Sequence, residues 1–76
     1  MVEFNETLDC KGLSCPMPII KLAKAMKKLP SGNVLELVGT DPGSKEDVPK
    51  WCTKTGNQLL GSADEGGANV FYIRKA

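Results

Sequence analysis

The sequence predicts a two-layer α/β (α+β) sandwich in which two helices cover one face of a four-stranded mixed sheet, in the order β-α-β-α-β-β. Three patterns carry this prediction: an amphipathic helical stretch at 16–29, a β-rich run at 34–38, and two strand patterns flanking Gly66-Gly67. Each of these elements has only one apolar side to bury. We therefore expect both helices to pack on the same face of the sheet.

The first strand is predicted at 4–10, where Phe4 and Leu8 stand among polar neighbours, and a loop follows at 11–14. Gly12 is free to take a positive φ in that loop. The helix predicted over 16–29 begins at Pro16, because the first turn of a helix tolerates proline. Its apolar face comprises Ile19, Leu22, Ala23, Met26 and Leu29. Its opposite side carries Lys21, Lys24, Lys27 and Lys28.

The second half of the chain predicts a strand at 33–39, a turn at 40–43, a helix, and a hairpin of strands at 57–62 and 69–75. Ser44 with Asp47 resembles a capping box at the start of this second helix. We expect the helix to end at Thr55, with Gly56 as the residue that terminates it. Gly66-Gly67 is typical of a two-residue hairpin turn.

Length and charge restrict the function. A chain of 76 residues predicts one domain over 1–76, with no room for an internal cofactor cavity, so we predict no cofactor. Ten basic and nine acidic side chains nearly cancel, which disfavours binding to nucleic acid or to an anionic membrane. The chain contains no long apolar run and no N-terminal signal pattern, so a cytoplasmic monomer without membrane contact is expected.

The chemistry-bearing residues are three cysteines, Cys10, Cys15 and Cys52, in a chain without histidine. The odd number disfavours a secreted disulfide framework. The absence of histidine excludes Cys-His catalysis and histidine-containing zinc sites, and three cysteines are too few for a structural zinc site. No metal site is therefore predicted.

Cys15 directly precedes Pro16 and hence the predicted helix. At or beside the N-cap, free backbone N–H groups and the positive end of the helix dipole favour an anion such as a thiolate. We therefore expect an exposed Cys15 thiol whose pKa is lowered by the helix start or by nearby lysines. Cys52, beside Trp51, is expected to be buried packing.

The stretch Asp9-Cys10-Lys11-Gly12-Leu13 followed by Cys15-Pro16-Met17-Pro18 resembles the motif of the TusA/SirA-like sulfur-carrier family. The resemblance continues through Thr40-Asp41-Pro42, Asp47, Trp51-Cys52-Thr53 and the closing Tyr72-Ile73-Arg74-Lys75, and so covers almost the whole chain. The resemblance implies the same β-α-β-α-β-β sandwich. Met17 stands where some members carry an acidic residue, so the partner surface of this chain is expected to differ.

The family resemblance also implies a function. Cys15 would accept sulfane sulfur as a persulfide and pass it to an acceptor protein's cysteine, acting stoichiometrically as a sulfurtransferase-type carrier. The donor would be a cysteine desulfurase or a rhodanese-type protein, and the pathway tRNA thiolation, molybdenum-cofactor synthesis or sulfur oxidation. Pro16, Pro18 and Gly12 would position the thiol. Residues that could form the partner-docking surface are Met17, Lys21, Lys24, Asp41 and Asp47.

Two other functions stay open at this point. The lysine side of the first helix could bind RNA, although the near-neutral net charge argues against it. Alternatively, Cys10 could be a second thiol that pairs with Cys15 in thiol–disulfide exchange, although a Cys-x-x-Cys spacing would be the stronger redox pattern.

Overall fold

The computed structural model describes residues 3–76, so residues 1 and 2 of the predicted domain lie outside the described part. The order of elements is the predicted one. The elements are β1 (Glu6–Cys10), α1 (Met17–Lys28), β2 (Val34–Gly39), α2 (Ser44–Thr55), β3 (Gln58–Glu65) and β4 (Ala68–Arg74). No helix within this described part is both long enough and apolar enough to cross a membrane.

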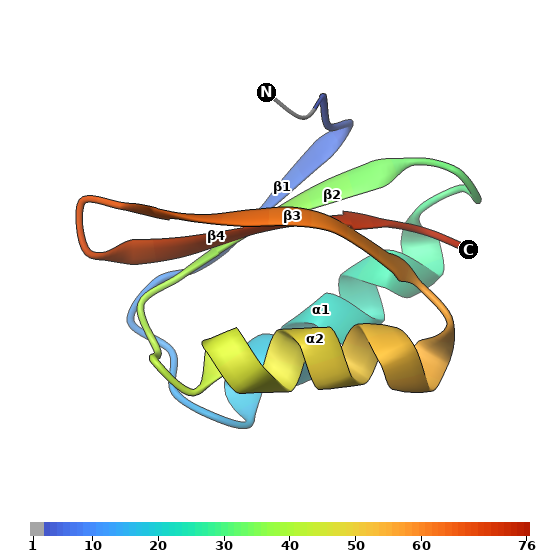
Figure 1. The fold of residues 1–76 in the computed structure, drawn as a ribbon. Helices are drawn as coiled ribbons and strands as arrows, with labels where there is room; N and C mark the ends of the chain where they lie inside the picture. The colour runs from blue at the N-terminus through green and yellow to red at the C-terminus, as the bar shows by residue number, and fades with distance from the viewer. Residues whose placement is uncertain (1–2) are drawn as a thin grey trace.

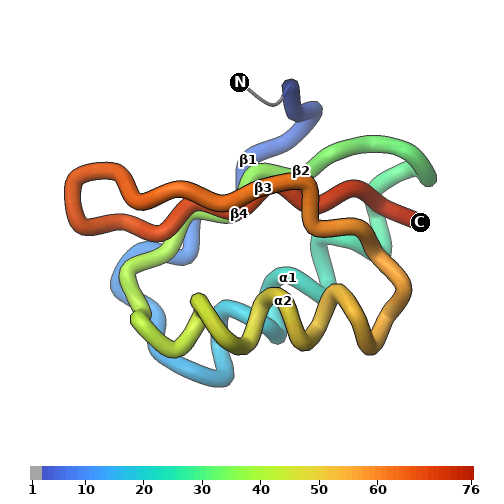
Figure 2. The backbone as a smooth tube through the Cα atoms, viewed as in Figure 1, coloured from blue at the N-terminus to red at the C-terminus, as the bar shows by residue number. Residues whose placement is uncertain are grey.

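The four strands form one mixed sheet in the order β1-β2-β4-β3. β1 runs parallel to β2, whereas β2 with β4 and β3 with β4 are antiparallel pairs. Both helices lie on the same face of this sheet, and no helix of residues 3–76 covers the opposite face (Figure 1). The backbone trace shows the same two layers (Figure 2). The predicted fold class is confirmed.

The core lies between the sheet and the two helices. Leu37 on β2 pairs with Leu8 on β1 and with Phe71 on β4, so one row of side chains crosses three strands. Leu22 on α1 and Val48 on α2 are fully buried and belong to the same hydrophobic core cluster as Leu37 and Phe71. The apolar face predicted for the first helix is therefore the face that packs on the sheet.

The hairpin of β3 and β4 turns at Gly66 and Gly67, whose φ angles of 55° and 83° are both in the left-handed region that glycine adopts without a penalty. β3 continues to Glu65, beyond the predicted end at residue 62. The ladder is extended by polar residues, with Asp64 opposite Asn69. Side chains of this kind give no alternating apolar pattern, which is why the sequence underestimates the strand.

The starts of β1 and α2 differ from the prediction. β1 begins at Glu6 rather than at Phe4, whose ring packs against the Tyr72 ring with centroids 5.8 Å apart. Ser44 is not the cap of α2, because Gly43 already has helical φ and ψ and is itself the N-cap. Ser44 is the first helical residue and is buried. The predicted end at Thr55 and the left-handed Gly56 after it are confirmed.

Candidate functional site

Cys15 lies in the loop between β1 and α1 and is exposed, whereas Cys10 and Cys52 are buried. All three are free cysteines. Burial raises the pKa of Cys52 to about 11, so this thiol stays protonated near neutral pH. Cys15 is therefore the one cysteine whose sulfur a second protein can reach.

The start of α1 differs from the prediction in a way that affects Cys15. The helix begins at Met17, and its N-cap is Pro16, which makes no side-chain capping bond. The Met17 N–H donates to the Ser14 carbonyl at 2.9 Å, and the Ile20 N–H donates to the Pro16 carbonyl at 3.1 Å. Cys15 thus precedes the N-cap. At least one N–H of the first turn already has a partner in the preceding loop.

The backbone of Cys15 is held by the opposite loop. Its N–H donates to Oδ2 of Asp41, in the turn between β2 and α2, at 2.9 Å. The Cys15–Pro16 peptide bond is cis. A second contact joins the same loops, because the Gly12 N–H donates to Oγ1 of Thr40 at 3.0 Å. Residues 26 and 28 positions apart in the sequence therefore fix the Cys15 loop.

The thiol of Cys15 points to α2. Its Sγ donates to Oδ2 of Asp47 at 3.2 Å. This hydrogen bond raises the pKa of the Cys15 thiol, desolvation adds to the effect, and the charges of Asp47 and Asp41 act in the same direction. The expected lowering of the thiol pKa by the helix start or by lysines is therefore wrong. The charged groups that act on Cys15 are carboxylates, and they favour the protonated form.

The sequence pattern assigns Asp41 to a turn and Asp47 to a helix cap, with partner docking as a further possible role for both. Asp41 does shape the turn, because its Oδ1 accepts the Gly43 N–H at 3.2 Å. Asp47 makes no capping bond and binds the Cys15 thiol instead. The structure thus brings both carboxylates to Cys15.

Asn69 on β4 is a site residue that the sequence analysis missed. It is only 7% exposed, and its Nδ2 donates to the backbone carbonyl of Asp41 at 3.1 Å. This bond ties the Asp41 turn to the sheet. A polar residue at the head of an apolar strand pattern was the available signal, since a buried amide needs a partner.

The other predicted positioning residues lie around this loop. Gly12 has a φ of 81°, which favours glycine, and an added Cβ would meet nothing within 4 Å. Pro18 is fully buried, whereas Pro16 is exposed beside Cys15. Gly12 thus permits the loop conformation, and Pro18 anchors the first turn of α1 in the core.

The predicted docking residues form two groups, the carboxylates Asp41 and Asp47 that contact Cys15 and the exposed residues Met17, Lys21 and Lys24 of α1. Met17, 43% exposed, lies near Cys15 in the sequence at the start of α1. Lys21 and Lys24 are exposed and line a shallow hollow of about 320 Å³ with residues of α1 and β1. Cys15 is not among the residues that line this hollow. Of the predicted docking residues, Asp47 contacts the Cys15 thiol and Asp41 contacts the Cys15 backbone N–H.

Cys10 ends β1 and is part of the hydrophobic core, with no exposed surface. Burial is the main cause that raises the pKa of its thiol, and the charge of Lys21 partly opposes it. A buried, protonated thiol is a poor resolving nucleophile. The structure therefore gives Cys10 a packing role and does not support a redox pair with Cys15.

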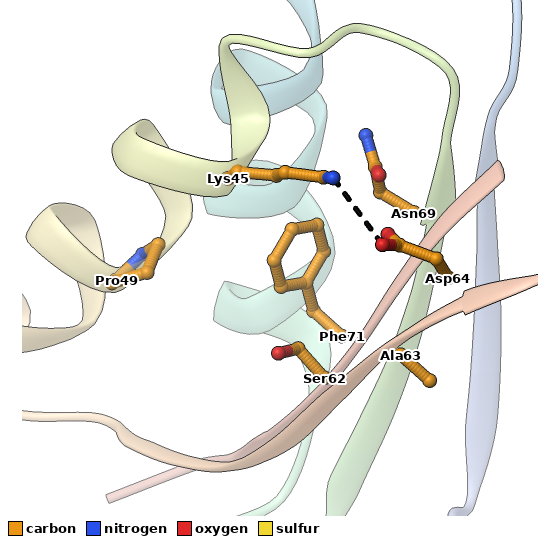
Figure 3. A pocket seen from close by; sticks show the side chains of 7 residues that line it. All are labelled: Lys45, Pro49, Ser62, Ala63, Asp64, Asn69 and Phe71. Atoms are coloured by element: carbon orange, nitrogen blue, oxygen red, sulfur yellow. Dashed lines mark hydrogen bonds and ion pairs between the residues drawn. The ribbon is translucent and has the colours of Figure 1, made fainter. Parts of the chain in front are cut away.

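A pocket of about 390 Å³ lies between α2 and the hairpin of β3 and β4 (Figure 3). Lys45 and Asp64 form an ion pair at 3.3 Å beside it, and Phe71 and Asn69 contribute to its wall. Cys15 is not among its lining residues. Within residues 3–76, no cluster of side chains has the composition of a metal site. The pocket therefore adds no nucleophile or metal centre to the Cys15 site.

The fold and its exposed thiol define a class of protein, the SirA-like two-layer sandwiches. A crystal structure of the SirA-like protein from Desulfitobacterium hafniense matches with a TM-score of 0.81 and 25% sequence identity, over 92% of this chain and 96% of that one. This likeness agrees with the strand order and with the two helices on one face.

Within that class, the family model described as sulfurtransferase TusA matches residues 6–75. The sulfur carrier protein TusA of Allochromatium vinosum is 42% identical over 76 residues, which is all of both chains. The putative sulfur carrier protein YrkI of Bacillus subtilis is 46% identical over 71 residues, covering 93% of this chain and 95% of that one. The chain belongs to the TusA family of sulfur carriers, and the resemblance seen in the sequence is confirmed.

Proposed function

We propose that the protein carries sulfane sulfur as a persulfide on Cys15 and passes it to a cysteine of an acceptor protein. The observation that carries the proposal is the contrast among the thiols: Cys15 is exposed at the family motif, whereas Cys10 and Cys52 are buried. A carrier needs one sulfur that two successive partners can reach. It also needs no second accessible thiol that would expel the cargo as sulfide.

The loading step transfers one sulfur atom and consumes no oxidant. The Cys15 thiol gives up its proton, and its thiolate attacks the outer sulfur of the donor's persulfide. The S–S bond of the donor breaks, and its electron pair stays on the donor's cysteine as a thiolate. In delivery the acceptor's thiolate attacks the outer sulfur on Cys15, and the pair of that S–S bond returns to Cys15.

We propose a cysteine desulfurase or a rhodanese-type protein as the donor, because both chemistries present sulfur on a reactive cysteine. The recipient is a protein with an accessible thiolate. Its pathway is thiolation of tRNA, molybdenum-cofactor synthesis or sulfur oxidation. A reducing compartment such as the cytoplasm keeps such thiols free.

The docking surface would surround Cys15. Met17 offers an exposed apolar side chain two residues after Cys15, at the start of α1, and Asp41 and Asp47 offer negative charge. Lys21 and Lys24 would extend the contact along α1. The site is built from the loops and helices of one chain, so we propose that one monomer of one domain suffices for transfer.

The two alternatives gain no support. The relatives are sulfur carriers by name, and nothing in the comparison favours RNA binding by the lysines of α1. The buried position of Cys10 argues against thiol–disulfide exchange with Cys15.

The test is to load the protein from a cysteine desulfurase supplied with cysteine and to locate the added sulfur by peptide mass spectrometry. We expect one extra sulfur on Cys15. The Cys15→Ser variant should gain none, whereas the Cys10→Ala variant should load like the wild type. A disulfide between Cys10 and Cys15, or sulfur on the Cys15→Ser variant, would contradict the proposal.

A further inference from the structure

The hydrogen bond between the Cys15 thiol and Asp47 bears on the protonation state of the sulfur as well as on its position. We propose that the Asp47 carboxylate holds the empty Cys15 as a neutral thiol and repels the persulfide anion that forms there on loading. Asp47 is then a positioning residue that distinguishes the empty carrier from the loaded one. The inference rests on the proposed function and deepens it.

The empty state follows from the geometry. An ionised carboxylate can only accept hydrogen bonds, so the contact of 3.2 Å between Sγ and Oδ2 of Asp47 requires a proton on the sulfur. Removing that proton replaces a hydrogen bond by repulsion between two anions. Asp41, whose Oδ2 holds the Cys15 N–H at 2.9 Å, adds a second negative charge nearby. The pKa of Cys15 is raised accordingly. The empty carrier therefore presents little thiolate to oxidants and electrophiles.

The loaded state cannot keep the same contact. The inner sulfur of a persulfide is bonded to carbon and to the outer sulfur, and it has no proton to donate. The outer sulfur is more acidic than a thiol and carries the negative charge near neutral pH. Because Cys15 is exposed, its side chain can turn into solvent, away from Asp47 and Asp41. The outer sulfur is thereby presented to a partner.

Delivery of the sulfur restores the empty state, in which the Cys15 thiol donates to Asp47. When an acceptor thiolate removes the outer sulfur, the electron pair of the broken S–S bond returns to Cys15. That sulfur takes a proton from the solvent and donates it again to Asp47. The hydrogen bond is present only before loading and after delivery, so it shifts the equilibrium of sulfur exchange toward the empty carrier. Asp47 therefore favours release of the cargo.

The first experiment measures how the reactivity of the empty Cys15 thiol depends on pH, and it involves no sulfur transfer. The rate of alkylation of Cys15 by iodoacetamide is followed against pH by peptide mass spectrometry. The Asp47→Asn variant keeps the shape and an acceptor oxygen but loses the charge. We expect its alkylation midpoint to fall and its rate at pH 7 to rise about threefold to tenfold.

The control is Glu46→Gln, which removes the same charge from the neighbouring, exposed position of α2. It should leave the midpoint unchanged, and Asp47→Glu should return it toward the wild-type value. Equal midpoints for Asp47→Asn, Glu46→Gln and wild type would overturn the inference. Circular dichroism of each variant shows whether the fold is retained.

The second experiment lets two carriers compete for one sulfur. Wild-type protein loaded with inorganic polysulfide is mixed without oxygen with an equal amount of empty, ¹⁵N-labelled Asp47→Asn protein, and the reverse mixture is prepared. From both directions we expect about threefold to tenfold more sulfur on the variant. A mixture with Glu46→Gln should divide the sulfur equally.

The outcomes separate the two proposals. Equal division between the wild type and Asp47→Asn overturns the role of Asp47 and leaves the carrier function intact. Failure of every form to take sulfur from polysulfide and from a donor enzyme overturns the carrier function and the loaded half of this inference. The alkylation midpoints then still decide whether Asp47 holds the empty thiol.

Discussion

Replacing Asp41 with alanine should both destabilise the protein and release the Cys15 loop. The Asp41 carboxylate accepts the Cys15 N–H at 2.9 Å through Oδ2 and the Gly43 N–H at 3.2 Å through Oδ1. Bonds to a charged acceptor contribute about 1.5–3 kcal/mol each when buried, and partial exposure reduces that to about 1 kcal/mol each. We therefore expect Asp41→Ala to lower the free energy of unfolding by about 2 kcal/mol.

Asp41→Asn should lie between the wild type and alanine. Asparagine has one acceptor oxygen, so it can accept one of the two N–H groups and must turn its NH₂ toward the other. The expected loss is about 1 kcal/mol, which corresponds to a fall in melting temperature of about 4–8 °C for a domain of this size. Urea and thermal unfolding at neutral pH measure both quantities.

Asp9→Ala provides the matched control. The Asp9 carboxylate, near the end of β1, also accepts a backbone N–H, that of Lys11 at 2.9 Å, but this bond joins residues only two positions apart and does not involve Cys15. Hydrogen exchange at the Cys15 amide should accelerate in Asp41→Ala and remain slow in Asp9→Ala. An Asp41→Ala protein with wild-type stability and a slowly exchanging Cys15 amide would refute the view that Asp41 holds this loop.

Three further predictions concern the support of the site and the core. Asn69→Ala removes the bond to the Asp41 carbonyl and should cost about 1 kcal/mol by urea unfolding, with faster exchange at the Cys15 amide as the sign that the turn has loosened. Burial raises the pKa of Cys52 to about 11, so the folded protein keeps this thiol protonated at pH values where the unfolded chain loses the proton. The stability that comes from the buried neutral thiol is therefore complete below the ordinary thiol pKa and is lost as the pH rises toward 11. The unfolding free energy should therefore fall between pH 9 and 11 by about 2 kcal/mol more in the wild type than in Cys52→Ala. If the unfolding free energies of the two proteins fall in parallel with pH, Cys52 does not cause the pH dependence. Leu22→Ala empties a fully buried position and should cost about 3–4 kcal/mol in urea unfolding at pH 7, whereas a loss below about 1 kcal/mol would mean that the core collapses around the gap.

The fold could be predicted because its determinants are local. The first helix repeats its apolar residues at helical spacing, and Leu22 and Met26 on that stripe are buried in the structure. The left-handed Gly56 ends α2, and Gly66 and Gly67 turn the hairpin. Each of these signals depends on a few neighbouring residues, so the sequence alone contains it.

The candidate site was predicted only in part, because its contacts join distant residues. The position and exposure of Cys15 follow from the motif, but its two carboxylate partners are 26 and 32 residues away. The capping pattern of Ser44 and Asp47 was wrong because the turn that Asp41 forms makes Gly43 the N-cap. That change leaves the Asp47 side chain free to bind the thiol.

The error in the expected pKa of Cys15 has a physical origin. The dipole of a helix acts through N–H groups that have no partner, and the Met17 N–H already donates to Ser14. A carboxylate at hydrogen-bond distance then outweighs the remaining partial charges, because it is a full charge with a direct bond to the proton. A prediction from the residues next to Cys15 considers only α1, whereas the pKa of the thiol is raised mainly by Asp47 on α2.

A raised pKa is compatible with sulfur transfer because a carrier and an enzyme meet different requirements. An enzyme's nucleophile must be reactive whenever substrate arrives, which favours a permanent thiolate. A carrier meets its donor and its acceptor in separate complexes, and each partner can bring its own groups to the sulfur. With Asp47 and Asp41 beside it, the empty Cys15 stays protonated in between. The same two charges act against the loaded anion, so one arrangement protects the empty carrier and favours delivery by the full one.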